Sequence, residues 1–273
     1  MRITTLAVVA LTFTAGIASA DDDCRYREGR RVTAPIAGVT KIVVHGAAGT
    51  LHVDGRQGIS EVLAAGTACT SESGFIDDMT LTARRSGSEL HIEAHIPEKR
   101  IVFGFFAAKL DFGVVVPYGI AVEVEDGSGW LKVTNVGAAR IEDGSGELEI
   151  RNVRGNLTVQ DGSGNTTIDG VSGNVDIEDG SGELRITNVA GNVQIEDDSG
   201  SIVVSRVEGA LLVRDDGSGS IDARNIRRGV TIDDDGSGAI DVADIGGDFT
   251  VHRKGSGNID HVRVAGRVTI PRD

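Results

Sequence analysis

The chain has 273 residues, with 27 Lys and Arg against 41 Asp and Glu, which gives a formal net charge of −14 at pH 7. So acidic a surface repels nucleic acids and anionic lipid head groups, and this excludes both as expected partners. Aromatic residues make up only 4% of the sequence beside 38 glycines, a balance that favours many tight turns around a narrow aliphatic core over a conventional globular interior.

The first 20 residues have the composition of a secretory signal peptide. Arg2 precedes an apolar run from Ile3 to Ile17, and the small residues Ala18-Ser19-Ala20 predict cleavage after Ala20. Three aspartates follow directly, and they would be costly to bury if this run were a core element. We therefore expect an exported protein in the periplasm, at the cell surface or outside the cell, with no integral membrane span in the mature chain.

The two cysteines of the chain, Cys24 and Cys69, are an even number in a chain expected to be exported. This favours one disulfide, which would contribute about 3 to 4 kcal/mol by restricting the unfolded chain. Two free thiols are the alternative. Because the chain has no Cys-x-x-Cys motif, neither cysteine is expected to be catalytic.

Residues 36–125 follow an N-terminal segment at 21–35 and contain short runs of alternating or continuous apolar residues bounded by turn residues. Such runs are typical of strands, and we expect them to form the first, irregular coils of a solenoid. Residues 73–79 are expected to form a short helical turn in a loop. The runs are 41–44, 50–53, 81–83, 89–96, 110–116 and 121–124.

The most apolar segment of the mature chain is 101–108, which contains Phe103, Phe105 and Phe106. We expect a loop or hairpin that covers the N-terminal opening of the solenoid. A tip that touches a membrane or a partner protein is the alternative.

From residue 126 to the C-terminus the motif Asp-Gly-Ser-Gly recurs with a period of 17 to 19 residues. The period is too short for a helical repeat and suits a coil of strands. The last copy begins with Lys254 instead of aspartate. The motif serines are Ser128, Ser145, Ser163, Ser181, Ser199, Ser218, Ser237 and Ser256.

Apolar residues alternate between these corners, as in Leu148 and Ile150 and then Leu157 and Val159. Period-two alternation predicts strands with one face inward. A second corner with the pattern Asn-Val-x-Gly, seen at Asn152 and Asn188, divides each repeat into two short strands. We therefore predict an all-β, single-chain parallel β-solenoid of turns of about 18 residues, with acidic corners facing solvent. The general preference of parallel crossovers favours right-handed winding.

The end of this solenoid is also visible in the sequence. His261 falls in a column that Ala223 and Val242 hold in earlier turns, and Pro271 follows the last strand, where a missing N–H no longer matters. These residues predict a terminal cap, because a solenoid must protect its open ends from edge pairing.

The run Asp111–Pro117 (Asp-Phe-Gly-Val-Val-Val-Pro), with the alternating strands and glycine corners after it, resembles the bacterial putative-adhesin family of exported β-solenoids. The similarity spans roughly residues 36 to 270, and a more distant one links the chain to the head domains of autotransporter adhesins. The resemblance implies a cell-envelope or surface location and adhesin-like binding. Its motifs are repetitive, so it implies no catalytic residue.

Two sets of residues are candidate metal ligands. His91, Glu93 and His95 share one strand face, but the two histidines lie about 13 Å apart on an extended strand, too far for one ion unless His45 or His52 approaches from a neighbouring strand. The corner aspartates are the weak candidates for calcium, because carboxylates about 4.8 Å apart repel each other and a cation would relieve the repulsion. They are Asp143, Asp161, Asp179, Asp198, Asp216 and Asp235.

Several observations argue against an enzyme. The serines stand in Gly-Ser-Gly corners and not in a Gly-x-Ser-x-Gly elbow, and no phosphate-binding loop is present. We expect a non-enzymatic, adhesin-like binding or structural module that needs no cofactor and contacts a protein or glycan along its lateral face. A calcium-stabilised secreted repeat protein and a carbohydrate-active β-helix enzyme are the alternatives.

Overall fold

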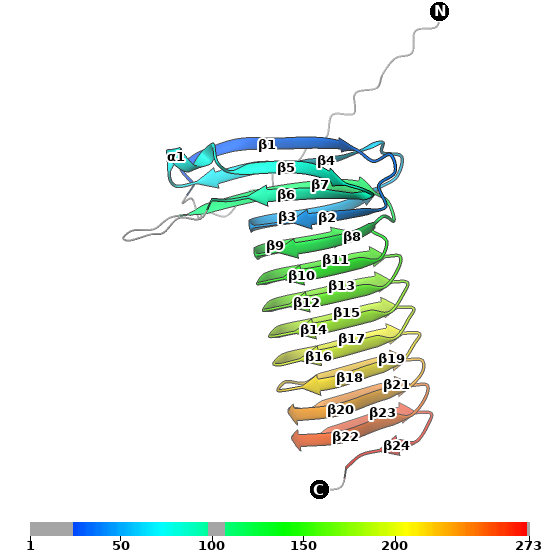
Figure 1. The fold of residues 1–273 in the computed structure, drawn as a ribbon. Coiled ribbons are helices and arrows are strands. Elements are labelled where there is room, and N and C mark those ends of the chain that lie inside the picture. The colour runs from blue at the N-terminus through cyan, green and yellow to red at the C-terminus, as the bar shows by residue number, and fades with distance from the viewer. Residues whose placement is uncertain (1–23, 98–106, 272–273) are drawn as a thin grey trace, which may run out of the picture.

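The computed structural model describes residues 24–97 and 107–271 as a straight rod with a wider N-terminal head (Figure 1). The expected signal peptide and most of the apolar segment 101–108 lie outside the described residues. The all-β prediction is confirmed, since 69% of the residues are in strands and the rod is a β-solenoid of about 8 turns. No helix of the described part is long and apolar enough to cross a membrane.

The rod consists of two strands per turn, one in each of two parallel stacks. Strands of the first stack follow the Asp-Gly-Ser-Gly corner, and strands of the second stack lead into it. The first stack holds β9 (Ser128–Thr134), β11 (Gly146–Val153), β13 (Gly164–Val171), β15 (Gly182–Val189), β17 (Gly200–Val207), β19 (Ile221–Ile226), β21 (Ile240–Ile245) and β23 (Ile259–Val264). The second holds β8 (Ala121–Asp126), β10 (Ala139–Asp143), β12 (Leu157–Asp161), β14 (Val175–Asp179), β16 (Val193–Asp197), β18 (Leu211–Asp216), β20 (Val230–Ser237), β22 (Phe249–Ser256) and β24 (Val268–Thr269).

The head contributes seven more strands and one short helix. The helix lies in the segment where the sequence predicts a helical turn, which confirms that expectation. The elements are β1 (Tyr26–Pro35), β2 (Lys41–His45), β3 (Ala48–Arg56), β4 (Glu61–Thr70), α1 (Ser73–Ile76), β5 (Thr80–Ser86), β6 (Glu89–His95) and β7 (Ala108–Pro117).

All strands belong to two twelve-stranded sheets. Sheet A has the order β1-β4-β7-β3-β9 and then the odd-numbered strands to β23, and sheet B has the order β5-β6-β2-β8-β10 and then the even-numbered strands to β24. The coils of the head are therefore not stacked in chain order, because the β2–β3 coil lies between the β6–β7 coil and the β8–β9 coil. Antiparallel pairs β1–β4, β4–β7 and β5–β6 complete the head, so it is more than a run of irregular coils.

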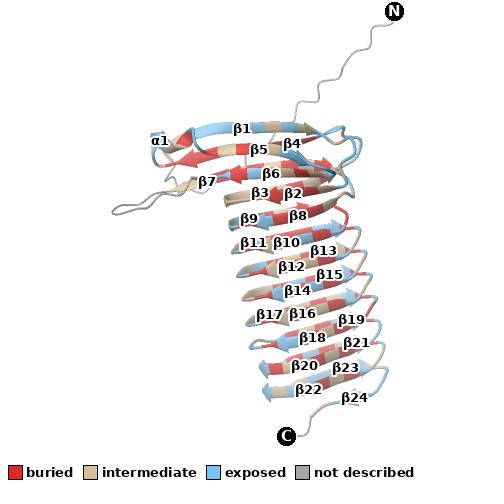
Figure 2. Cartoon of the chain, viewed as in Figure 1, coloured by how far each residue is buried: buried red, intermediate tan, exposed pale blue. Residues whose placement is uncertain are grey.

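The core consists of straight columns of aliphatic side chains, one column for each inward strand position. Ile150, Ile168 and Ile186 are paired in register and fully buried, and their equivalents from Val133 to Val242 are buried as well. Figure 2 shows the resulting alternation of buried and exposed positions along the strands. β-branched residues suit such columns because their stiff side chains stack on a pleated surface.

Each corner depends on backbone that L-residues rarely adopt. Gly164 has φ +131°, and a Cβ there would lie 1.6 Å from the carbonyl oxygen of Gly146 in the turn before. At the second corner Asn152 and Asn188 have φ of 58° and 59°, the left-handed conformation that asparagine tolerates best after glycine. The glycines and asparagines that recur in the sequence are therefore the residues that the turns and their close stacking require.

The ends of the rod differ. A disulfide joins Cys24, just before β1, to Cys69 of β4, which confirms the predicted pairing. At the other end His261 continues the column of Ala223 and Val242, as expected, and its ring lies 6.3 Å from that of Phe249.

Candidate functional site

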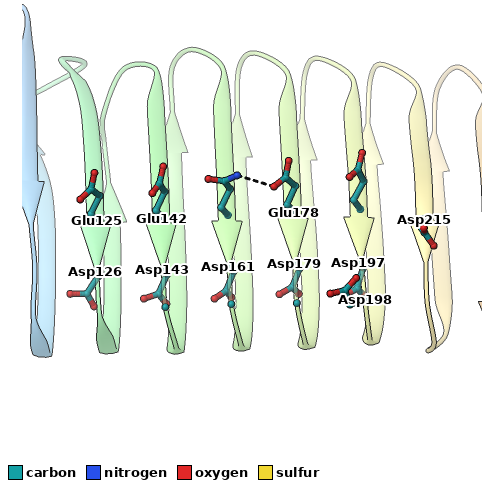
Figure 3. Close-up of a pocket in the computed structure, with 15 residues that line it drawn as sticks. Glu125, Asp126, Glu142, Asp143, Asp161, Glu178, Asp179, Asp197, Asp198 and Asp215 are labelled. Carbon is teal, nitrogen blue, oxygen red and sulfur yellow. Dashed lines mark hydrogen bonds between the residues drawn. The ribbon is translucent and has the colours of Figure 1, made fainter.

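A column of seven aspartates runs along the rod at the Asp-Gly-Ser-Gly corners. Each is the last inward residue of its sheet-B strand, and parallel pairing in register stacks the seven about 4.8 Å apart. We call this column the aspartate ladder (Figure 3). Its members are Asp126, Asp143, Asp161, Asp179, Asp197, Asp216 and Asp235.

The expectation that the acidic corners face solvent is wrong for these side chains. The aspartates of the ladder are only 0 to 9% exposed. The reason is the strand period: Ala139, Ile141 and Asp143 are alternate residues of β10, so the aspartate continues the inward face that the aliphatic residues begin. The aspartate that the sequence predicts as a solvated turn former therefore places its carboxyl group in the core.

A second correction concerns Asp198, which the sequence assigns to this column. In the structure Asp197 pairs with Asp179 and Asp216, whereas Asp198 is exposed. This corner reads Asp-Asp-Ser-Gly, so Asp198 stands where the other corners have their first glycine. The remaining five candidates, Asp143, Asp161, Asp179, Asp216 and Asp235, do lie in the ladder, together with Asp126.

The ladder has a defined boundary at each end. At the head, a Cβ on Gly46 would lie 2.0 Å from Oδ1 of Asp126, so the first carboxyl occupies space that only a glycine leaves free. At the other end, Lys254 takes the next register position after Asp235. The column of acidic groups therefore ends against a cation.

Burial leaves most of these carboxyl groups without partners. Both side-chain oxygens of Asp126, Asp143, Asp179 and Asp216 are buried and have no hydrogen-bond partner among the described residues. Two members differ: Oδ2 of Asp161 accepts a 2.6 Å hydrogen bond from the Thr166 hydroxyl, and Oδ1 of Asp197 accepts one of 3.2 Å from the Ser199 N–H.

This environment favours the protonated form of the ladder. Burial, and then the charges of Asp161 and Asp197, raise the pKa of Asp179 to about 7. Burial raises the pKa of Asp143 and of Asp197 to about 6 and that of Asp126 and of Asp216 to about 7, with neighbouring aspartates adding to the effect. Near neutral pH the ladder is thus a partly protonated chain of carboxyl groups.

A shallow groove runs along the aspartate ladder at the edge of sheet B. Its volume is about 640 Å³, and it is lined by the ladder aspartates from Asp126 to Asp197 and by the residue before each of these, for example Glu142 and Glu178 (Figure 3). Gln160 separates these two glutamates and donates a 2.8 Å hydrogen bond to Glu178. The groove is acidic, but an amide and arginines such as Arg140 and Arg214 interrupt its row of carboxylates.

Most of the calcium candidates lie along the groove, since ladder aspartates such as Asp143 and Asp179 line it together with Glu142 and Glu178. Among residues 24–97 and 107–271, no three His, Cys, Asp or Glu side chains are grouped closely enough to hold a metal ion. Calcium takes six to eight oxygen ligands. The ladder aspartates are only 0 to 9% exposed, whereas both carboxyl groups of a glycosidase pair must reach the substrate.

The histidine candidates lie on a solvated strand face, and His45 joins them from a neighbouring strand. His91, Glu93 and His95 lie on the outward face of β6, as predicted. His45 approaches from β2, and its ring stacks on that of His91 at a centroid distance of 6.5 Å. Nδ1 of His45 lies 2.9 Å from Oε2 of Glu125, so this ring nitrogen is engaged in a hydrogen bond with a carboxyl group.

Three solved structures of low sequence identity are similar to this chain. A putative adhesin from Parabacteroides merdae is 12% identical with a TM-score of 0.43, covering 90% of this chain and 96% of that chain. A putative cell adhesion protein from Clostridium sporogenes is 14% identical with a TM-score of 0.35, over 90% and 99% of the two chains. A putative adhesin from Parabacteroides distasonis is 13% identical with a TM-score of 0.35, over 86% and 97%.

A search of curated proteins gave no match. The family model of Toastrack DUF4097 matches residues 70–252, which is more than half of the chain and covers most of the rod. This match agrees with the resemblance to a family of β-solenoid proteins that the repeats indicate. The chain belongs to the Toastrack DUF4097 family.

Proposed function

We propose that the protein is an exported, non-enzymatic binding module of the bacterial cell envelope. In this adhesin-like role the rod engages its ligand along its flank through many weak contacts. The apolar leader and the Cys24–Cys69 disulfide support export, because disulfides persist in oxidising compartments.

The observation that carries the proposal is the register of the outward side chains. Parallel pairing places each outward residue directly beside its equivalents, so the flank of sheet A presents straight rows of side chains spaced about 4.8 Å apart. A ligand that follows such rows gains affinity from each additional contact. One row consists of Lys132, Glu149, Thr167, Arg185, Val203, Asp222, Asp241 and Asp260.

The distribution of charged groups on the rod favours a binding function over a catalytic one. The charged groups of the ladder are buried, and many of the outward ones form ion pairs with neighbours, as Arg224 does with Asp222 and Arg263 with Asp244. Catalytic acids typically combine a raised pKa with access to the substrate, and in the described residues the carboxyl groups whose pKa is raised are those of the buried ladder.

A binding and turnover assay on residues 21–273 tests the proposal. The purified protein should bind at least one of immobilised bacterial cells, extracellular-matrix proteins or arrayed glycans, and it should release no product from chromogenic glycosides, esters or peptides. Turnover above a heat-unfolded control would contradict the proposal, and so would the absence of saturable binding across all three surfaces.

A shortened rod tests the lateral mode. Deletion of residues 182–199 removes one complete turn and joins equivalent corners, because Gly200 pairs in register with Gly182. The variant should fold and bind more weakly than the full-length rod, since it offers fewer contacts. Unchanged affinity would locate the binding site outside the repeated flank.

A further inference from the structure

Two exposed aromatic side chains lie at the junction between the head and the rod. Trp130 and Tyr118 are 37% and 38% exposed and are the only large aromatic residues of the described chain in that class. Trp130 pairs with Thr50 near the start of β3, and the Tyr118 N–H donates a 2.9 Å hydrogen bond to the Arg56 carbonyl at its end. The backbone positions of the two residues are therefore separated by the length of β3 between them, about 20 Å. The Arg154 guanidinium covers the Tyr118 ring at 4.9 Å from its centroid, and Tyr118 lines a separate hollow with Asn135 and Asn152.

A hollow of about 290 Å³ lies on the outer face of sheet A between these two positions. Gly113 of β7 pairs with His52 of β3 and leaves the hollow open, since a Cβ there would meet nothing nearer than the His52 carbonyl oxygen at 3.7 Å. This glycine has no positive φ and no close backbone neighbour to require it. Because Gly113 has no side chain, it leaves the hollow open at the surface.

Fixed polar groups line the hollow. Asp54 accepts hydrogen bonds from Arg56, Thr134 and Asn135 at 2.8, 2.9 and 3.0 Å. Although burial alone would raise it, these donors lower the pKa of Asp54 overall, so the carboxylate is a fixed, ionised acceptor. The side-chain entropy of ordering this group is thus already lost before any ligand binds.

The side chains on the side of the hollow nearer Trp130 are also held in place by contacts with one another. The Lys132 ammonium donates a 3.0 Å hydrogen bond to Glu149 and lies 5.7 Å from the Trp130 ring centroid. His52 meets the Trp130 ring edge-on with centroids 5.0 Å apart, and its Nε2 is the one buried side-chain nitrogen of the described chain without a hydrogen-bond partner.

The charged side chains at the hollow are paired with each other, Arg56 with Asp54 and Lys132 with Glu149. An ionic ligand would have to compete with these pairs. A neutral ligand with many hydroxyl groups would not, because hydroxyls both donate to carboxylates and accept from guanidinium and ammonium groups. Trp and Tyr offer flat apolar faces with a polar edge, which suit the C–H face of a sugar ring.

We propose that the Gly113 hollow, with Trp130 at its edge, is a binding site for an oligosaccharide. A sugar ring stacks on Trp130, and the hydroxyl groups of the sugar bond to Asp54, Arg56 and Lys132. This inference rests on the proposed binding function and specifies where on the rod a glycan ligand binds.

Trp130 is the only tryptophan of the chain, so its fluorescence reports this site directly. The mature protein is titrated with the hexaoses of cellulose, chitin, starch and mannan. At least one should change the emission saturably. Gly113→Val fills the hollow and should weaken that binding by about tenfold or more.

Thr158→Val on the outward face of sheet B is the matched control, since it also adds an outward valine, and it should leave both the affinity and the melting midpoint unchanged. No emission change with any hexaose overturns the inference, and so does undiminished hexaose binding in Gly113→Val.

The deletion of residues 182–199 distinguishes this site from the lateral mode. It should weaken binding to cells or matrix while the hexaose affinity remains that of the full rod. If the full rod binds cells or matrix but no hexaose, the proposed function stands and the oligosaccharide site is rejected.

Discussion

Asp197 and Asp198 are adjacent in the chain but lie in opposite environments. Asp197 is 2% exposed and stacks between Asp179 and Asp216 in the core, whereas Asp198 replaces a corner glycine and is exposed. The pair is thus an internal control for the energetics of the aspartate ladder.

Stability should fall as pH rises because of the ladder. The folded-state pKa of Asp197 is raised to about 6 from 3.8, first by burial, so the native state binds a proton that the unfolded chain has already released. The free energy of unfolding is therefore highest below about pH 4 and declines as pH rises to about 7. Melting curves at pH 5 and pH 8 measure this decline.

Asp197→Asn should raise the free energy of unfolding at pH 8 by about 1 to 3 kcal/mol, because it removes a buried charge beside two others. At pH 4.5 it should change little, and the Ser199 N–H keeps its acceptor. Asp198→Asn should have a smaller effect at pH 8, because the charge of Asp198 adds to the pKa shift of Asp197 only after burial. Equal effects of the two substitutions would contradict the burial of the ladder.

Thr166 is the one polar residue in an inward column of leucines and isoleucines, and its hydroxyl bonds to Asp161. Thr166→Val should cost about 1 to 3 kcal/mol at pH 8, since the buried carboxylate loses its donor. Denaturant titration measures the cost, and the surface variant Thr158→Val should show none. A stabilised Thr166→Val protein would mean that packing outweighs this hydrogen bond.

Much of the fold could be predicted because one short period controls it. Leu148, Ile150 and their equivalents alternate in the sequence and are buried in the structure, and the glycine corners repeat where the chain turns. The order of the head coils could not be predicted, because no local pattern of β2 and β3 specifies that they pair with β6 and β7 as well as β8 and β9. That order depends on long-range pairing.

The ladder shows why the site was harder to predict than the fold. Aspartate at a glycine corner usually faces solvent as a turn former, and this preference leads to the wrong prediction for the ladder. The same alternation that identifies Ile141 as inward extends two residues to Asp143, and this signal locates the ladder. The hollow at Gly113 carries no such signal, because the reordered head places Gly113 of β7 and Trp130 of β9 on either side of β3.

Gly164 tests the stacking of the corners. Gly164→Ala places a Cβ 1.6 Å from the Gly146 carbonyl oxygen at φ +131°, so we expect a loss of at least 3 kcal/mol or failure to fold. Gly29→Ala, where a Cβ meets nothing within 4 Å, is the control and should change stability by less than about 0.5 kcal/mol. The midpoint of denaturant unfolding compares the two, and a tolerant Gly164 would contradict the close contact between turns.

Calcium should not change the stability of the rod, because the described carboxyl groups do not converge on one ion. We expect the same melting midpoint in 5 mM chelator and in excess calcium at constant ionic strength. A rise of several degrees with calcium, absent with sodium, would show that the acidic groove binds the ion specifically.

The disulfide should stabilise the head more than the rod. Cys24 and Cys69 are 45 residues apart, and closing such a loop contributes about 4 kcal/mol on the chain-entropy model. The bond fixes the start of β1 against β4, which in turn pairs with β7, so its loss acts on the antiparallel strands first. In a Cys24→Ala, Cys69→Ala variant, amide exchange should accelerate in β1 and β4 while the turns from β11 to β19 remain protected. Equal loss of protection along the whole chain would show instead that head and rod unfold as one unit.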